Sequence, residues 1–481
     1  MEQEQSIKKN YIYNTFYQIL TLVTPLITTP YLSRVLGADC IGIQSYTASI
    51  ESYFFLFATL GTATYGQREI ARFRDNPKLV SKAFWQIEII TIISTLICLV
   101  GWFILALSSR EYGSYYLVMT FTVLGAVLDI TWFYEGYERF NIIVTRNTLI
   151  KILGIVIIFI FVRSRDDLLL YIGLSSFLGM LGQLSMWIPL KKFIIKVPLK
   201  ELEFKESLKQ VWIYFVPTIA STVYTMLDKT MLQWITKDKF QNGYYEQANK
   251  FINMGTGLIC SLNTVMSSRM SYLFEKNKKE EIKEKLAMSM DYILLLGILI
   301  WFGLTGTAKG LIPWFCGNGY EPVISLLMIY SPLILIIGIS NCLVRQLLIP
   351  SGQRARSTKG IILGAVINMV INLVLIPFLA AKGAAIASIV AEVSIVVIFM
   401  YMSREYLALK KFAKGLLLRL FSAGIMLVVL LKLGDIWSAT LIYTLLEAVI
   451  GAGIYFFILI MLRDRMVFEL LGYVVRKNWK K

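Results

Sequence analysis

The chain has 481 residues, 57% of them hydrophobic, and its mean hydropathy of +0.64 is too high for a soluble domain. It carries 48 Lys and Arg against 31 Asp and Glu, a net charge of +17, and no histidine. Without histidine, His-ligated metal sites, His general bases and His-containing triads are all excluded. The sequence also lacks a G-x-x-x-x-G-K-[ST] loop, and its five scattered cysteines form no C-x-x-C pair. We therefore expect free thiols, no metal site and no enzymatic turnover.

Fourteen apolar runs are each long enough to cross a bilayer, which takes roughly 20 mostly apolar residues. In chain order they are residues 11–32, 42–66, 83–107, 115–134, 147–162, 168–190, 211–235, 244–270, 286–307, 322–348, 360–379, 383–402, 415–432 and 439–462. The pattern predicts an all-α polytopic membrane protein with about 14 transmembrane helices.

Basic residues gather in every second gap between these runs. If the N-terminus is inside, the cytoplasmic segments hold 33 Lys and Arg, and the outside loops hold nine. Because cytoplasmic loops collect Lys and Arg, we predict that both termini are cytoplasmic. The first ten residues are polar and lead directly into a full span, so we predict no cleavable signal peptide. Charge scattered over many short loops suits an anionic lipid leaflet and argues against nucleic-acid binding.

The two halves of the chain resemble each other. The longest predicted cytoplasmic loop, 191–210, separates two sets of six spans, and three pairs of residues recur about 200 positions apart: Gly42 with Gly243, Pro25 with Pro217, and the Gly136–Arg139 turn with the Gly352–Arg354 turn. We predict a six-helix lobe at 1–195, a second at 196–410, and two further helices with a basic cytoplasmic tail at 411–481. Lobes with an even number of spans are related by an axis along the membrane normal, around a central cavity.

Two prolines mark positions where a span can bend. Proline removes a backbone hydrogen bond, so Pro25 and Pro217 are candidate helix bends for the first span of each lobe. Static kinks without a role in transport are the alternative interpretation.

Ionisable side chains inside spans are costly and usually face water or one another. The candidates are Glu51, Asp228, Lys229, Lys250 and Glu392, with Arg34 at the outer end of the first span. Further cations near cytoplasmic span ends, which we expect to reach water by snorkelling, are Lys151, Arg269, Arg345 and Arg419. Cations outnumber acids in the combined set, which favours an anionic ligand such as a phosphate. Internal pairing stays open, since Glu246 and Lys250 are spaced i, i+4.

Several stretches carry a recognisable pattern: P-Y-L-S-R-V-L-G-A-D-C-I-G-I-Q-S (Pro30–Ser45), W-F-Y-E-G-Y-E-R (Trp132–Arg139), L-D-K-T-M-L (Leu227–Leu232), G-Y-Y-E-Q-A (Gly243–Ala248), Q-L-L-I-P-S-G-Q (Gln346–Gln353), I-N-M-V-I-N-L (Ile367–Leu373) and K-G-A-A-I-A-S (Lys382–Ser388). They resemble the Wzx-type polysaccharide repeat-unit flippases of the multidrug, oligosaccharidyl-lipid and polysaccharide exporter superfamily. The resemblance covers the first twelve spans. Cys40 departs from it, because a more polar loop residue is usual there.

The resemblance implies a flippase of the bacterial cytoplasmic membrane that works by alternating access during O-antigen or capsule assembly. Its substrate would be an oligosaccharide carried on undecaprenyl pyrophosphate, and a polysaccharide polymerase and chain-length machinery would be partners. The positions that carry over as cavity residues are Arg34, Asp228, Lys229 and Lys250, with Glu51, Arg139 and Arg345 added. Glu51 and Glu392 are candidate coupling acids for Na⁺ or H⁺, and no other cofactor is expected.

Two other functions stay open at this stage. A cation-coupled multidrug exporter on the same fold would use acidic cavity residues, and Glu51 and Glu392 are available. The excess of cations favours the anionic lipid instead. A scaffold for polymer assembly that transports nothing is the other rival, and a charged interior weighs against it.

Overall fold

The computed structural model describes residues 2–407 and 409–469, and every regular element within these ranges is helical. The chain forms two compact units, Met1–Thr230 and Met231–Lys481. Ten helical segments in the described residues are long and apolar enough to cross a membrane. The predicted all-α polytopic fold is confirmed.

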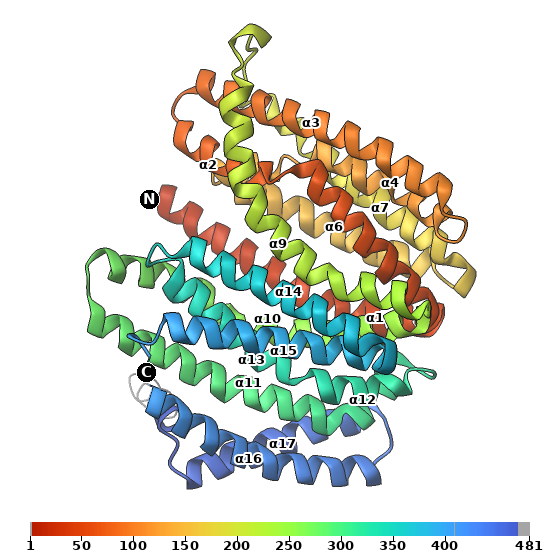
Figure 1. Cartoon of the computed structure of the whole chain (residues 1–481), viewed down its shortest axis with the longest axis vertical. Coiled ribbons are helices and arrows are strands. Elements are labelled where there is room, and N and C mark those ends of the chain that lie inside the picture. Colours follow the sequence, from red (N-terminus) through yellow and green to blue (C-terminus); the bar gives the residue numbers. More distant parts are fainter. Residues whose placement is uncertain (1, 408, 470–481) are drawn as a thin grey trace. The chain divides into compact units, whose positions relative to one another are not determined.

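The first unit consists of helices joined mainly by short turns (Figure 1). Its elements are α1 (Glu2–Thr59), α2 (Thr62–Phe73), α3 (Pro77–Ser108), α4 (Gly113–Leu128), α5 (Thr131–Gly136), α6 (Phe140–Phe161), the 3₁₀ turn η1 (Arg165–Asp167), α7 (Leu168–Ser185), α8 (Trp187–Leu190), the 3₁₀ turn η2 (Leu199–Glu201) and the greater part of α9 (Phe204–Thr236).

α1 is two helical arms joined at a break. Gly37 has φ +82° and ψ 168°, a conformation that is essentially restricted to glycine, and the chain turns back there (Figure 1). The two arms correspond to the predicted spans 11–32 and 42–66, and the break lies inside the predicted gap at 34–41. Pro25 lies within the first arm, and Pro217 lies within α9, which bends along its course in Figure 1.

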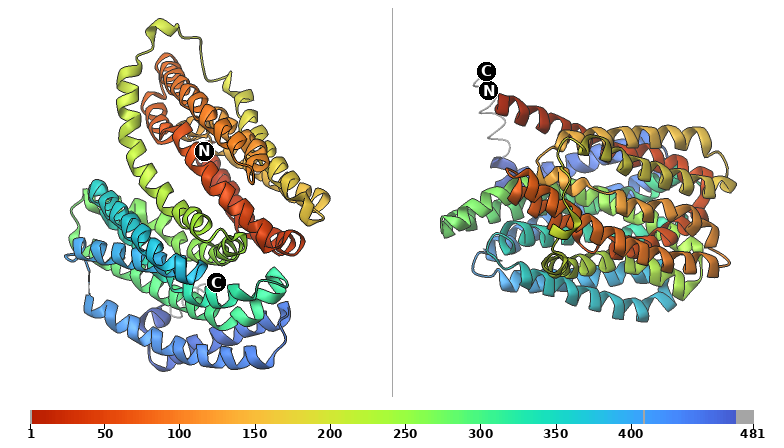
Figure 2. Two further views of the ribbon diagram at one scale, coloured as in Figure 1. Left: turned by 45° about the vertical axis from the view of Figure 1, so that its right-hand side comes forward. Right: turned by 90° about the horizontal axis from the view of Figure 1, so that it is seen from above.

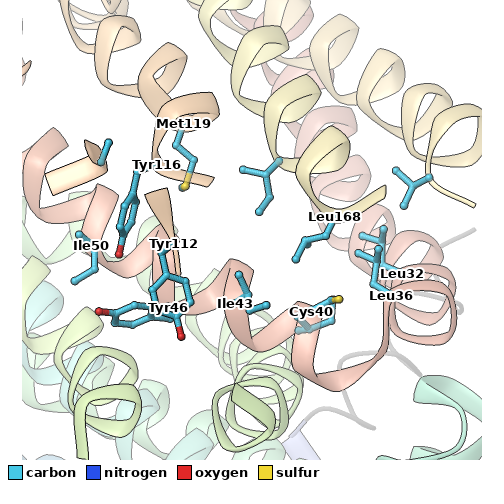
Figure 3. Close-up of a cluster of buried hydrophobic side chains, with 14 of the residues drawn as sticks. Leu32, Leu36, Cys40, Ile43, Tyr46, Ile50, Tyr112, Tyr116, Met119 and Leu168 are labelled. Carbon is cyan, nitrogen blue, oxygen red and sulfur yellow. The ribbon is translucent and has the colours of Figure 1, made fainter. Parts of the chain in front are cut away.

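Apolar side chains from both arms of α1 form a core with α4 and α7. Leu36 and Ile43, from either side of the break, pack in one cluster with Tyr116 and Leu168 (Figure 3). Trp102 of α3 is fully buried there, and its indole N–H donates to the carbonyl oxygen of Tyr116 over 3.1 Å. The cluster therefore holds the broken helix against three other helices.

The second unit follows a similar order of elements when all of α9 is counted with it, although α2 has no counterpart there, and it adds two helices. It begins with the end of α9 and continues with α10 (Lys239–Glu275), α11 (Lys279–Cys316), α12 (Glu321–Tyr330), α13 (Pro332–Leu343), the π-helical turn η3 (Val344–Leu348), α14 (Arg354–Leu379), α15 (Ala381–Met402), α16 (Leu409–Ile436) and α17 (Leu441–Met461). The break between α9 and α10 at Lys237 follows the break at Gly37 by 200 positions. Each unit then has an interrupted span, α4 with α5 and α12 with α13 and η3, followed by a helix pair. This order supports the predicted repeat; the axis and the lobe boundaries at 195 and 410 stay predictions.

α16 and α17 pack against α11 and each other (Figure 2). Arg419 of α16 is 2% exposed and is held by Asp464, which follows α17, and Asp291 of α11. The expectation that Arg419 snorkels to water is therefore wrong. A neighbouring helix supplies one carboxylate and the turn after α17 the other, so the guanidinium is paired inside the protein.

Four predicted spans are not among the ten apolar segments: 11–32, 42–66, 211–235 and 244–270. They correspond to the two arms of α1 and to α9 and α10. The spans that carry most of the candidate site residues are therefore less apolar than the others, and they open each half of the chain.

Candidate functional site

Hydroxyl groups fasten α9 to the second arm of α1. The Thr230 hydroxyl lies 3.0 Å from Ser49 Oγ and 3.2 Å from the Tyr53 hydroxyl oxygen. Asp228 and Lys229 directly precede Thr230; Asp228 is 6% exposed and Lys229 is half-buried. Within the first unit, Asp228 and Lys229 therefore lie beside residues 49–53 of α1. Two of the predicted site segments, the one around Glu51 and the one around Asp228, thus lie side by side.

Glu51 lies within that stretch of α1 but on another face. Two residues advance a helix by about 200°, so a side chain between Ser49 and Tyr53 points away from the hydroxyl contact. Glu51 is half-buried. The structure therefore brings Glu51 to the same level as Asp228 without directing it at Thr230.

Arg34 lies on the other arm of α1, less than one turn before Gly37, and its side chain is exposed. The turn after α6 clamps the break from both sides. The Tyr31 hydroxyl donates to the carbonyl oxygen of Val162 over 2.6 Å, and Arg165 pairs with Asp39 at 2.5 Å. Because one contact precedes Gly37 and the other follows it, this turn holds both arms of α1 close to the break, next to Arg34.

In the second unit, α10 is fastened at its start to α12 and α15. The Tyr245 hydroxyl lies 2.8 Å from that of Tyr330 and 3.4 Å from Ser388 Oγ. Glu392 is one turn beyond Ser388 on the same face of α15 and is 8% exposed. Lys250 is half-buried on α10, about 140° around the helix from Tyr245. Lys250 therefore lies outside the face that carries the tyrosine contact.

Arg345 and Arg139 lie at the ends of interrupted spans, and both side chains are exposed. Arg345 belongs to the π-helical turn, where its carbonyl oxygen accepts from Ser267 Oγ over 3.2 Å and the next residue, Gln346, donates to Asn263 Oδ1 over 2.9 Å. π-helical turns inside α-helices are often found at functional sites. Arg139 caps α6 after the turn that ends α5.

The candidate residues divide between the two units. Arg34, Glu51, Asp228, Lys229 and Arg139 belong to the first, and Lys250, Arg345 and Glu392 to the second. The structure brings Asp228 and Lys229 to the Glu51 segment of α1. A cavity shared by Arg34, Lys229 and Lys250 stays a prediction.

Three carboxyl groups inside predicted spans escaped the sequence argument, two of them buried and one, Asp129, half-buried. Glu88 of α3 and Glu447 of α17 are each 1% exposed, and Asp129 lies at the junction of α4 and α5. Each acid lies inside a predicted span, at 83–107, 439–462 or 115–134. A systematic search for acids within the apolar runs would have found them.

Comparison with known proteins places this geometry in a family. A family model described as "Polysaccharide biosynthesis protein" matches residues 7–274, more than half of the chain. A Shigella dysenteriae relative named "Putative O-antigen transporter" is 24% identical over 399 residues, 82% of this chain and 99% of the relative. An Escherichia coli (strain K12) relative of the same name is 25% identical over 395 residues, 80% and 94% of the two chains.

Solved structures show which fold this is. The structure titled "Lipid II flippase MurJ, inward closed conformation" matches with a TM-score of 0.71 at 19% identity, covering 95% of this chain and 99% of that one. An inward-facing multidrug resistance transporter of the MATE family, in the MOP superfamily, matches with a TM-score of 0.64 at 15% identity, covering 82% and 96%. At these identities the likeness establishes the fold alone.

Proposed function

Because the chain belongs to the polysaccharide biosynthesis protein family, as its motifs predicted, we propose that it is a flippase for a lipid-linked oligosaccharide. The substrate is a repeat unit on undecaprenyl pyrophosphate, moved across the bacterial cytoplasmic membrane for surface polysaccharide assembly. The O-antigen transporter names of two relatives and the fold shared with a lipid II flippase support this function. The chain acts as a transporter, and a polysaccharide polymerase and chain-length machinery act on the exported unit.

The observation that carries the proposal is the placement of charge. The two arms of α1, together with α9 and α10, hold Arg34, Asp228, Lys229 and Lys250, while the ten most apolar helical segments lie elsewhere. Intramembrane charge at matching places in two repeats suits a substrate path between them. A pyrophosphate bears about two negative charges, which two or three cations can bind in a partly dry site.

We assign the pyrophosphate to Arg34, Lys229 and Lys250. Ligand binding across the two lobes would favour one arrangement of the lobes over another, which is the differential affinity that alternating access requires. Arg34 supplies a planar fork of donors, whereas each lysine supplies a point charge. Replacement of Arg34 by Lys should therefore retain part of the export, and replacement by Ala should abolish it.

Deletion of the gene tests the function. Lipid-linked repeat units should accumulate on the cytoplasmic side, and surface polysaccharide should disappear. Wild type should restore export; a double Arg34→Ala, Lys250→Ala variant that inserts normally should not. Full export by that variant would remove the site assignment and leave the flippase standing. A deletion strain with normal surface polysaccharide and no accumulated lipid-linked sugar would refute the flippase itself.

A multidrug exporter on the same fold is the second candidate, favoured by the MATE structures and by the intramembrane acids Glu51 and Glu392. It predicts drug sensitivity in the deletion strain with unchanged polysaccharide. Both proposals place the two termini in the cytoplasm, on the 33-to-9 division of basic residues, and both leave Na⁺ or H⁺ as the coupling ion.

A further inference from the structure

The span formed by α4 and α5 is interrupted at an acidic residue. Asp129 has extended backbone angles, and its Oδ1 accepts from the Thr131 N–H over 3.0 Å and from the Thr131 hydroxyl over 2.5 Å. Arg146 of α6 donates in turn to the Thr131 hydroxyl oxygen over 3.0 Å. A guanidinium, a hydroxyl and a carboxylate are thus linked in series, so Asp129 has the donors that an ionised carboxylate needs.

A second carboxyl group faces this junction without such donors. Glu88 of α3 is 1% exposed, and its Oε1 accepts no hydrogen bond. Its neighbour Ile87 packs in one buried cluster with Ile130, the residue after Asp129, which brings the two carboxyl groups close enough to repel each other. Thr95, two turns further along the same face of α3, is fully buried, and its hydroxyl has no partner. An ionised carboxylate in this position would be desolvated, unpaired and next to a like charge.

The charges around the junction do not balance. Besides Glu88, Asp129 interacts electrostatically with Glu135 of α5, so three acids lie near the junction, which the Arg146 guanidinium reaches through Thr131. In the described part of the chain no three acidic or cysteine side chains converge closely enough to hold a metal ion. The missing positive charge is therefore better supplied by a proton than by a metal.

The junction also lies beside a cavity. A space of about 370 Å³ between α1, α4, α6 and α7 is lined by Arg146 and by the polar side chains of Thr122, Ser176 and Gln183. Arg146 both lines this cavity and donates to Thr131. Asp129 is thus linked to this cavity through Thr131 and Arg146.

We propose that Glu88 and Asp129 form a proton-binding site in the first unit, in which Glu88 carries the proton and Asp129 stays ionised. The two acids differ in the hydrogen-bond donors around them. Asp129 accepts hydrogen bonds from Thr131, which in turn accepts one from Arg146, whereas Glu88 Oε1 has no donor. Loss of the proton would place two like charges at the α4–α5 break. This site goes beyond the proposed function, because proton binding can be measured without any transported substrate.

Glu88→Gln is the decisive variant, since glutamine copies the shape and neutrality of a protonated acid. Wild type, Glu88→Gln and the exposed control Glu203→Gln are purified in one detergent, and thermal unfolding is followed from about pH 6 to about pH 9. The folded state of the wild type binds a proton that the unfolded state releases, so its stability falls as the pH rises. The unfolding temperature of Glu88→Gln should fall less steeply, while Glu203→Gln should follow the wild type.

Infrared spectra at neutral pH provide the second measurement. The carbonyl band of protonated carboxyl groups should lose intensity in Glu88→Gln and keep it in both Asp129→Asn and Glu203→Gln. Parallel stability curves for wild type and Glu88→Gln, an unchanged band in Glu88→Gln, or an unfolded Glu88→Gln protein at neutral pH would each overturn the site. The last outcome counts because glutamine keeps the size and neutrality of a protonated acid and should therefore be tolerated at this position.

Discussion

Replacement of Arg419 by Met should strongly destabilise the second unit. Its Nε and Nη2 donate to the two oxygens of Asp464 over 3.1 and 3.3 Å, and its Nη1 donates to the carbonyl oxygen and Oδ1 of Asp291 over 2.9 and 3.2 Å. Asp464 is 3% exposed, so the variant leaves a buried carboxylate without its cation. Such a change costs about 3–5 kcal/mol.

The lower end of that range applies here. Asp464 keeps hydrogen bonds from the N–H groups of Met466 and Val467 at 3.0 and 3.2 Å, and the Asp291 side chain is 38% exposed. A loss of about 3 kcal/mol lowers the unfolding temperature of a unit of this size by roughly 6–12 °C. Thermal unfolding of purified protein in detergent measures the shift.

Two comparisons make the experiment decisive. Lys309 and Asp435 join the same two helices, α11 and α16, in an exposed ion pair, so Lys309→Met should cost less than about 1 kcal/mol. Asp464→Asn combined with Arg419→Met removes the buried charge and should recover much of the loss. If Arg419→Met unfolds at the wild-type temperature, or the double variant is no better than the single one, the reasoning about a buried ion pair is wrong.

Three further changes test other contacts. Gly37→Ala should cost about 1–3 kcal/mol in thermal unfolding, because the backbone conformation of Gly37 excludes side chains. Gly179→Ala, inside helix α7 with open space around the added Cβ, should cost nothing and should stabilise the helix slightly. Equal losses for the two variants would contradict the break. Tyr245→Phe should cost about 1 kcal/mol, and the same change at Tyr330 should add little to it, since both changes remove the hydrogen bond between the two tyrosines. Additive losses would argue against the pair. A cysteine introduced into the loop at 191–210 should resist a membrane-impermeant thiol reagent in intact cells, and labelling from outside would reverse the proposed orientation.

Hydropathy and charge placement in the sequence determined the helical class and the approximate spans. They do so because a backbone that crosses lipid must satisfy its hydrogen bonds within its own helix. Each such helix is therefore recognised in the sequence as an apolar run. The gap at 34–41 contained the true break at Gly37, since a polar interruption between two apolar runs is a local signal. The four family motifs between Pro30 and Ala248 lie inside the family match over residues 7–274.

Side-chain partners depend on contacts between distant segments. Arg419 carries the same local signature as a snorkelling residue, and only the positions of Asp291 and Asp464, 128 and 45 residues away, show that it is paired. Glu51 lies two residues from Ser49, yet the packing of α9 on one face of α1 decides which of them meets Thr230.

The sequence by itself therefore determined which segments lie in lipid. It also identified the charged residues inside those segments, whose free-energy cost in lipid implies that they have a role. Only the tertiary structure decided what each charge meets, because an ion pair, a hydroxyl contact or an acid without a donor is a relation between helices that no single helix encodes. Glu88 and Arg419 are both charged residues in apolar surroundings, and their neighbours make one a paired cation and the other a candidate proton carrier.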